Sequence, residues 1–168
     1  MSTENLMRED AIKKIKELSE SAKICMFCTE LGKIPGNSRP MGLQETDDSG
    51  NLWFISSDTS NKNFEIKDDN RVMLYFMNNS NSEYLSIYGE AFVYKDRSTI
   101  EDKWSPIANA WFDGKDDPTV SIIRVEPKDT YYWDTKAGKL VSLLSFVAAA
   151  VSGKKSDNSD GVEGKATI

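Results

Sequence analysis

Hydrophobic residues recur with two different periods along the chain, and the change of period separates a first helix from a series of strands. In residues 4–21, Ile12, Ile15 and Leu18 follow one another at three-residue intervals with charged residues between them. This spacing places them on one face of a helix, so the pattern predicts an amphipathic α-helix over this stretch.

From residue 22 onward the hydrophobic residues come in short runs, many of them alternating, and Gly, Pro, Asn and Asp separate the runs. Such runs are typical of β-strands joined by turns. Gly89 stands near the middle of the longest run, where we expect a bulge or a bend. The predicted strands cover residues 23–31, 39–46, 51–57, 71–78, 82–96, 119–127 and 130–135.

The other predicted helices lie between these strands or after them. Residues 61–68 form a short helix, residues 97–107 a helix capped at Ser98 or Thr99, and residues 141–151 a final helix. A Rossmann fold is not indicated, because the elements do not alternate as βαβ and no G-x-G-x-x-G sequence follows a strand. We therefore expect an α+β, mainly β protein, built on an antiparallel six- to seven-stranded β-barrel with flanking helices.

The length of the chain fits one compact domain, which we place at residues 1–153. The remaining residues, 154–168, are polar, and we expect them to form a loosely ordered C-terminal tail.

The acidic composition limits the partners of this protein. The formal net charge is −6 and the pI is about 4.8, so we expect neither nucleic acid nor an anionic membrane as a partner. The first ten residues are acidic and lack the apolar core of a secretory signal. The most apolar stretch, residues 140–151, is shorter than the roughly 20 residues that span a bilayer. A cytoplasmic location is expected.

Two residue types limit the chemistry. Cys25 and Cys28 lie in a predicted strand, where residues three apart point to opposite faces, so we expect separate thiols rather than a redox pair or a metal site. The chain contains no histidine, which excludes Ser-His-Asp and Cys-His nucleophile systems and imidazole metal sites. If the protein is an enzyme, a bound cofactor is expected to supply the chemistry.

The segment SSDTSNKN, residues 56–63, packs hydroxyl groups and one lysine into eight residues after a hydrophobic strand. Such a segment can be a plain polar turn, or it can cradle a phosphate. If residues 39–44 and 52–56 are neighbouring antiparallel strands, Arg39 meets this segment at one end of the barrel, where it and Lys62 can bind a phosphate dianion. The alternative is a surface arginine paired with one of the many acids.

Pro40 interrupts the strand pattern directly after Arg39. Its missing N–H indicates an edge strand or a position facing a ligand. Gly42, two residues later, has no side chain, so a flat ligand could approach the backbone here; a bulged edge strand without a ligand explains the pattern as well.

These segments together resemble the FMN-binding split barrels related to pyridoxamine 5'-phosphate oxidase, and among them the general stress protein branch. The resemblance spans roughly residues 8–155 and depends on the order and spacing of its motifs. The motifs are SRPM at 38–41, LWFISSDTSNKNFEI at 52–66, VMLYF at 72–76, YLSIYGEAFV at 84–93, WFDGKDDP at 111–118 and YYWD at 131–134.

The resemblance implies a split β-barrel that binds FMN at the interface of a homodimer. Arg39 and Lys62 match the basic residues that hold the FMN phosphate, with Ser56, Ser60 and Asn61 beside them. Met41 and Gln44 match positions along the isoalloxazine ring next to Pro40, Ile55 lies on the neighbouring strand, and Trp133 matches an aromatic residue that reaches the flavin from the other subunit.

Some positions depart from the family pattern. Gln44 stands where the oxidase has a lysine, and Asn61 where it has an arginine, so we expect weaker flavin binding. The substrate-reading Arg-x-His motif is absent, which makes pyridoxamine phosphate oxidation an unsuitable assignment. The resemblance predicts an FMN-binding, stress-associated oxidoreductase of unknown small-molecule substrate. The alternatives are a non-catalytic flavin-binding or sequestering protein, or a related barrel that uses the deazaflavin F420.

Overall fold

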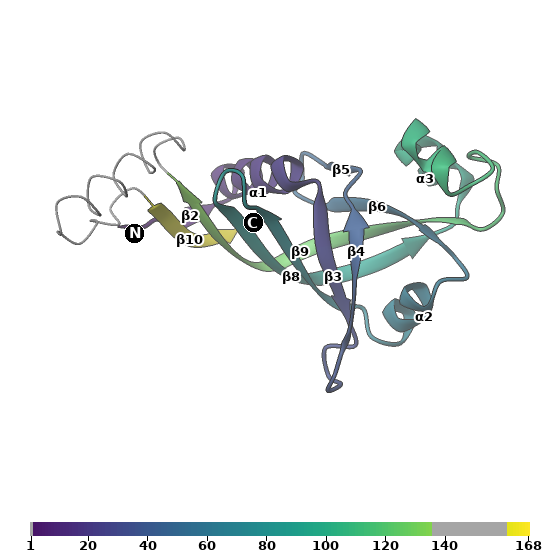
Figure 1. Cartoon of the computed structure of the whole chain (residues 1–168), viewed down its shortest axis with the longest axis horizontal. Coiled ribbons are helices and arrows are strands. Elements are labelled where there is room, and N and C mark those ends of the chain that lie inside the picture. Colours follow the sequence, from purple (N-terminus) through teal and green to yellow (C-terminus); the bar gives the residue numbers. More distant parts are fainter. Residues whose placement is uncertain (1, 136–160) are drawn as a thin grey trace.

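The computed structural model describes residues 2–135 and 161–168 (Figure 1). The helix predicted over residues 141–151 lies outside the described residues. Among the described helices, none is long and apolar enough to cross a membrane.

The first helix, α1 (Glu9–Ala22), confirms the amphipathic pattern, since Ala11, Ile15 and Leu18 are buried on one face. It begins later than predicted, because residues before it form two short strands, β1 (Ser2–Thr3) and β2 (Leu6–Met7). The helix ends at Lys23, which adopts a left-handed conformation with φ 64° and donates its backbone N–H to Ser19 O. This turn sends the chain directly into the sheet.

The sheet follows the order β1-β10-β9-β8-β7-β3-β4, and from β10 to β4 all neighbouring strands are antiparallel. A second branch leaves β9 through β6 to β5. The remaining bounds are β3 (Ile24–Thr29), β4 (Asn37–Gly42), β5 (Glu45–Thr46), β6 (Leu52–Ser57), β7 (Arg71–Asn78), β8 (Glu83–Tyr94), β9 (Val120–Thr135) and β10 (Gly161–Thr167).

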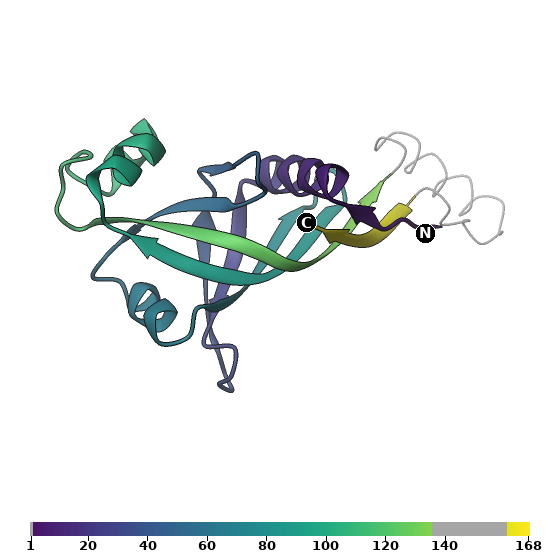
Figure 2. The same cartoon turned by 180° about the vertical axis from the view of Figure 1, so that it is seen from behind.

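The split-barrel prediction is confirmed: the sheet is strongly curved but does not close (Figures 1 and 2). No ladder joins β4 to β6 within the described part of the chain, and a single backbone bond from Gln44 N to Trp53 O (2.8 Å) links the two sides. The predicted irregularity at Gly89 is also confirmed, because the β8–β9 register shifts between Tyr88 and Gly89.

The pairing of the strand that carries Arg39 differs from the prediction. We expected residues 39–44 to pair with residues 52–56 across the turn at 47–50. Only β5 and β6 pair there, with Thr46 opposite Leu52, whereas β4 pairs with β3 and places Arg39 opposite Phe27. The predicted run was in fact two strands, since the chain leaves one sheet edge after Gly42 and joins the other at Glu45.

Two other segments also differ. The predicted strands 119–127 and 130–135 form one long strand, β9. The expected loosely ordered tail contains β10, in which Val162 and Ala166 are buried against α1 and the neighbouring strands. Gly164 is required in this strand, because a Cβ there would lie 1.7 Å from Glu4 O.

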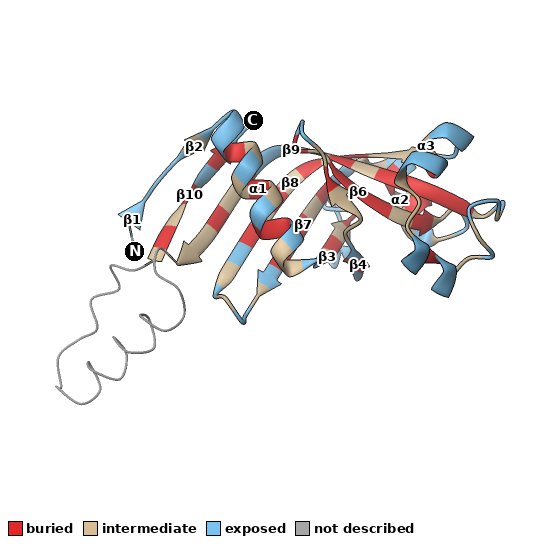
Figure 3. Ribbon diagram, turned by 90° about the horizontal axis from the view of Figure 1, so that it is seen from above, coloured by how far each residue is buried: buried red, intermediate tan, exposed pale blue. Residues whose placement is uncertain are grey.

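The core lies between α1 and the concave side of the sheet (Figure 3). Phe27 and Phe54, from strands on the two sides of the split, meet edge to face with ring centroids 5.4 Å apart. A smaller cluster packs under α3 (Arg97–Lys103), where Ile100 contacts β6 and β9. Asp96, not Ser98 or Thr99, caps α3, since its carboxylate accepts from Thr99 N at 2.9 Å. A 3-10 helix, η1 (Pro106–Ala110), follows in place of the end of the predicted helix.

Candidate functional site

The hydroxyl-rich segment connects β6 to α2 (Asn61–Asp68) and leaves the start of that helix open. Ser60 is the N-cap residue in extended conformation, but its side chain makes no capping hydrogen bond. The backbone N–H groups of Asn61 and Lys62 have no hydrogen-bond partner among the described residues. Free N–H groups and the helix dipole favour an anion at such a helix start.

A buried polar network fixes this helix start to the sheet. Ser56 Oγ donates to Asn63 Oδ1 (3.0 Å), and Asn63 Nδ2 donates to Ser121 Oγ (2.7 Å) on β9. Ser121 Oγ donates in turn to the backbone oxygen of Ser56 (3.1 Å), and Ser60 Oγ reaches Asn63 Oδ1 at 3.3 Å. Ser56 is 3% exposed, so its hydroxyl holds the helix in place rather than facing solvent.

Arg39 is the third residue of β4, and its side chain reaches Glu65 on α2. Its Nη1 donates to Thr29 Oγ1 (2.7 Å) and its Nη2 to Glu65 Oε2 (2.8 Å). Arg39 is therefore paired with an acid, and its charge also acts on Lys62 of the hydroxyl segment. A guanidinium has five N–H donors, and these two bonds leave three of them for another ligand.

Lys62 is half-buried in the first turn of α2, close enough to Arg39 for their charges to repel. Burial lowers the pKa of Lys62 and the positive charge of Arg39 lowers it further, while Glu65 partly offsets the shift. Within residues 2–135 and 161–168, no carboxylate lies within 4.0 Å of its ammonium. Two cations and an open helix start thus gather at one place, and this arrangement favours a bound anion.

The residues predicted to lie along a flavin ring are divided between the two faces of the sheet. Pro40 and Gly42 are exposed on the edge strand β4, and a Cβ at Gly42 would meet nothing within 4 Å. The side chain of Met41 points the other way and packs in the core. Gln44 and Ile55 are half-buried at the split between the two sheet edges.

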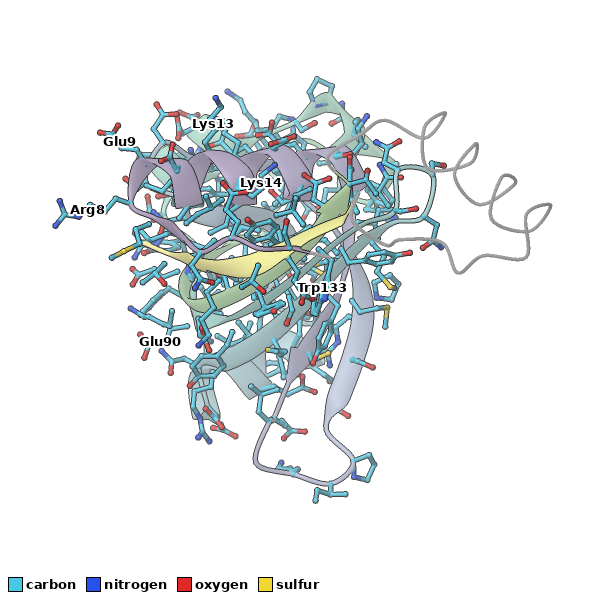
Figure 4. All side chains as sticks on the ribbon, turned by 90° about the vertical axis from the view of Figure 1, so that its left-hand side faces the viewer. Arg8, Glu9, Lys13, Lys14, Glu90 and Trp133 are labelled. Atoms are coloured by element: carbon cyan, nitrogen blue, oxygen red, sulfur yellow. The ribbon has the colours of Figure 1, made fainter. Side chains whose placement is uncertain are left out.

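The convex face of the sheet, opposite α1, carries exposed aromatic and methionine side chains. We call this surface the outward face; it includes Ile24, Met26, Tyr75, Met77, Tyr84 and Trp133, and Figure 4 shows Trp133 on the side of the sheet away from α1. A hollow of about 540 Å³ opens on it, lined only by uncharged residues.

Trp133 lies in this hollow, far from Arg39 along the sheet. Strands β8, β7 and β3 separate β9 from β4. At about 4.8 Å per strand, this path along the curved sheet is roughly 19 Å long. Trp133 and Arg39 therefore lie on strands that are not neighbours in the sheet.

The two cysteines do not form a site together. Cys25 is buried in the core opposite Met41, while Cys28 is half-buried in the same strand, opposite Ser38. Burial raises the pKa of both thiols, which favours their protonated form. In the described part of the chain, no cluster of His, Cys, Asp or Glu is arranged to hold a metal ion.

Comparison with known proteins identifies the family to which this chain belongs. The family model for pyridoxamine 5'-phosphate oxidase like proteins matches residues 10–157. The chain belongs to this family. It is 27% identical over 155 residues to Protein bli-3 of Neurospora crassa, an alignment that covers 84% of this chain and 74% of that protein.

Solved structures of general stress proteins share the fold. General stress protein 26 from Jannaschia sp. CCS1 superposes with a TM-score of 0.76 at 21% identity, covering 95% of this chain and 98% of the other. The general stress FMN/FAD binding protein of Xanthomonas citri superposes with a TM-score of 0.64 at 25% identity, covering 76% and 90%.

Sequence reasoning missed three residues that organise the site. Asn63 and Ser121 form the buried network, and Glu65 binds Arg39. Asn63 belongs to the hydroxyl-rich segment, but the composition of that segment does not distinguish Asn63 from its polar neighbours. Ser121 and Glu65 carry no local signal, because their roles depend on contacts with other strands.

Proposed function

We propose that this protein binds FMN, with the phosphate held between Arg39 and Lys62 at the start of α2. The single observation that carries the proposal is the pair of neighbouring cations, one of which has no carboxylate partner within the described residues. A phosphate dianion relieves their repulsion and accepts hydrogen bonds from both. Each charge-assisted hydrogen bond of this kind contributes about 1.5–3 kcal/mol.

The groups around the phosphate divide into two kinds in this proposal. Arg39, Lys62 and the backbone N–H groups of Asn61 and Lys62 donate to the phosphate. Ser56 supports the helix start from within the protein, and Ser60 is near enough to contribute its hydroxyl. Family membership and the flavin-binding relative in Xanthomonas citri support the same ligand.

The ring system of the flavin is proposed to lie along β4. Pro40 and Gly42 offer an exposed strand edge with little side-chain bulk, on which a flat ring can rest close to the backbone. Gln44 and Ile55, at the split between the sheet edges, would flank it. Met41 contributes only its main chain, since its side chain is in the core.

A second copy of the chain is the proposed partner on the outward face. Met77 is 55% exposed, Ile24 60% and Tyr75 42%, so this face presents a large apolar surface to solvent in the single chain. Exposed methionine and aromatic side chains without charges are typical of the core of a protein interface. In this proposed dimer, the partner copy would bring its own Trp133 toward the flavin.

Bound FMN supplies hydride chemistry at its N5 atom, so the activity we propose is that of an oxidoreductase acting on a small molecule. The residues of the chain bind the phosphate, orient the ring and cover it from water. A second candidate function is flavin sequestration without turnover, which the missing Arg-x-His motif favours.

The visible spectrum of the purified protein tests the proposal. We expect a yellow protein with a flavin spectrum, and mass spectrometry of the extracted ligand should give FMN rather than F420. A colourless protein that takes up no added FMN would contradict it. Rapid bleaching of the bound flavin by a reduced nicotinamide, under anaerobic conditions, would support the oxidoreductase over the sequestering protein.

A further inference from the structure

Glu65 lies on α2, one helical turn after Lys62, and its side chain is only 11% exposed. Its carboxylate receives hydrogen bonds from three side chains on the β3–β4 hairpin. Thr29 Oγ1 donates to Oε2 (2.5 Å), Arg39 Nη2 donates to the same oxygen (2.8 Å), and Asn37 Nδ2 donates to Oε1 (2.7 Å).

Arg39 and Thr29 close a ring with this carboxylate. Arg39 Nη1 donates to Thr29 Oγ1 (2.7 Å), and the same hydroxyl donates to Glu65. Each of the two terminal nitrogens of the guanidinium is thus held by a different oxygen, which fixes both the position and the plane of the group. The orientation of the remaining N–H donors of the Arg39 guanidinium is then fixed as well.

We propose that Glu65 is a positioning residue that holds Arg39 ready for the phosphate of FMN. The inference rests on the proposed function, and it goes further by giving a role to a carboxylate beside an anion site. A long arginine side chain has several rotatable bonds, and fixing them on binding weakens affinity. The ring of Glu65, Thr29 and Arg39 fixes them before the ligand arrives.

The alternative role of Glu65 predicts the opposite sign. A carboxylate next to Arg39 also cancels part of its charge, so a purely electrostatic role would make Glu65 a competitor of the phosphate. Removing it would then tighten FMN binding. If Glu65 positions Arg39, removing it loosens FMN binding although one negative charge leaves the site.

The charge state of Glu65 is consistent with the positioning role. Burial opposes its ionisation, but the hydrogen bonds from Thr29 and Arg39 and the charge of Arg39 outweigh burial and lower its pKa. The carboxylate is therefore ionised at neutral pH, and it accepts from all three donors.

The test compares FMN with riboflavin, which lacks the phosphate, by quenching of flavin fluorescence. We expect Glu65→Ala to weaken FMN binding about tenfold, because the ligand must then order the Arg39 side chain itself, and to leave riboflavin affinity unchanged. Glu65→Gln keeps one acceptor oxygen and should recover part of the loss. Glu101→Ala removes a carboxylate that pairs with Arg97 on α3, and it should change neither affinity.

Thr29→Val tests the same ring without altering charge. We expect Thr29→Val to lower FMN affinity while riboflavin affinity stays the same. If Glu65→Ala does not fold, Thr29→Val tests the inference in its place. Equal or tighter FMN binding by Glu65→Ala or Thr29→Val would overturn the inference. A parent protein that binds no FMN, or binds FMN and riboflavin equally, would instead overturn the proposed function.

Discussion

Lys62 offers the cleanest single perturbation of the anion site. Replacing it by alanine removes one of the two cations, and no described carboxylate within ion-pair distance is left unpaired. Arg39→Ala, by contrast, would also strip a partner from Glu65. A change in FMN affinity in Lys62→Ala can therefore be attributed to the lost contact between Lys62 and the ligand.

The expected loss follows from the type of bond that disappears. One charge-assisted hydrogen bond contributes about 1.5–3 kcal/mol, which corresponds to a dissociation constant roughly 10 to 150 times weaker. Riboflavin should bind as before. Without ligand, the free energy of unfolding should change by no more than about 0.5 kcal/mol, because Lys62 has no carboxylate within ion-pair distance among the described residues and is repelled by Arg39.

The assay is a titration of each protein with FMN and with riboflavin at fixed ionic strength, followed by flavin fluorescence, together with thermal unfolding of the ligand-free proteins. Lys67→Ala is the matched control, because Lys67 lies on the same helix but is exposed and only approaches the Phe64 ring. Unchanged FMN affinity in Lys62→Ala, or an equal loss in the control, would refute the assignment of Lys62 to the phosphate.

Three further predictions concern pH, packing and assembly. Because the pKa of Lys62 is lowered, FMN affinity should fall as pH rises through that pKa, at a pH below the usual lysine pKa of 10.5. Lys62→Arg should move this fall to higher pH. A flat profile of FMN affinity in a pH titration would contradict the prediction. A Cβ at Gly89 would lie 2.5 Å from the backbone oxygen of Glu126, so Gly89→Ala should destabilise the protein by about 1–3 kcal/mol in denaturant unfolding, and an unchanged midpoint would count against the packing described. Met77→Glu should convert a dimer to monomers in light scattering, whereas Ile107→Glu, at a position 71% exposed on η1, should not; a monomeric parent protein would contradict the proposed assembly.

Much of the fold could be predicted because its elements are repetitive. The three-residue spacing of Ile12, Ile15 and Leu18 identifies α1, and the hydrophobic runs identify β3 and β6 to β9. The family could be recognised from the order of its motifs. None of these inferences requires knowing which strands lie side by side.

Strand pairing was harder to predict because local patterns do not specify it. The turn at residues 47–50 does join two paired strands, but Arg39 lies on the preceding strand and pairs with β3. Similarly, β10 reads as a polar tail because only Val162 and Ala166 are hydrophobic, and small residues suffice there since β1 and β2 lie close against it.

The site was predictable at its basic residues and not at the groups that hold them. Arg39 and Lys62 stand out because phosphate binding needs cations. Glu65 looks like any surface acid in a charged helix, and its importance comes from Thr29 and Arg39, which are distant in sequence. Residues that act through long-range contacts give no local signal.

The most direct test of the central claim is the ratio of the affinities for FMN and riboflavin, measured on the unmodified protein at one ionic strength. The two ligands share the ring system and differ in the phosphate alone. If Arg39 and Lys62 bind that phosphate, FMN should bind at least about a hundredfold more tightly, the contribution expected from two charge-assisted hydrogen bonds at the lower end of their range. Equal affinities, or no binding of either flavin, would contradict the account.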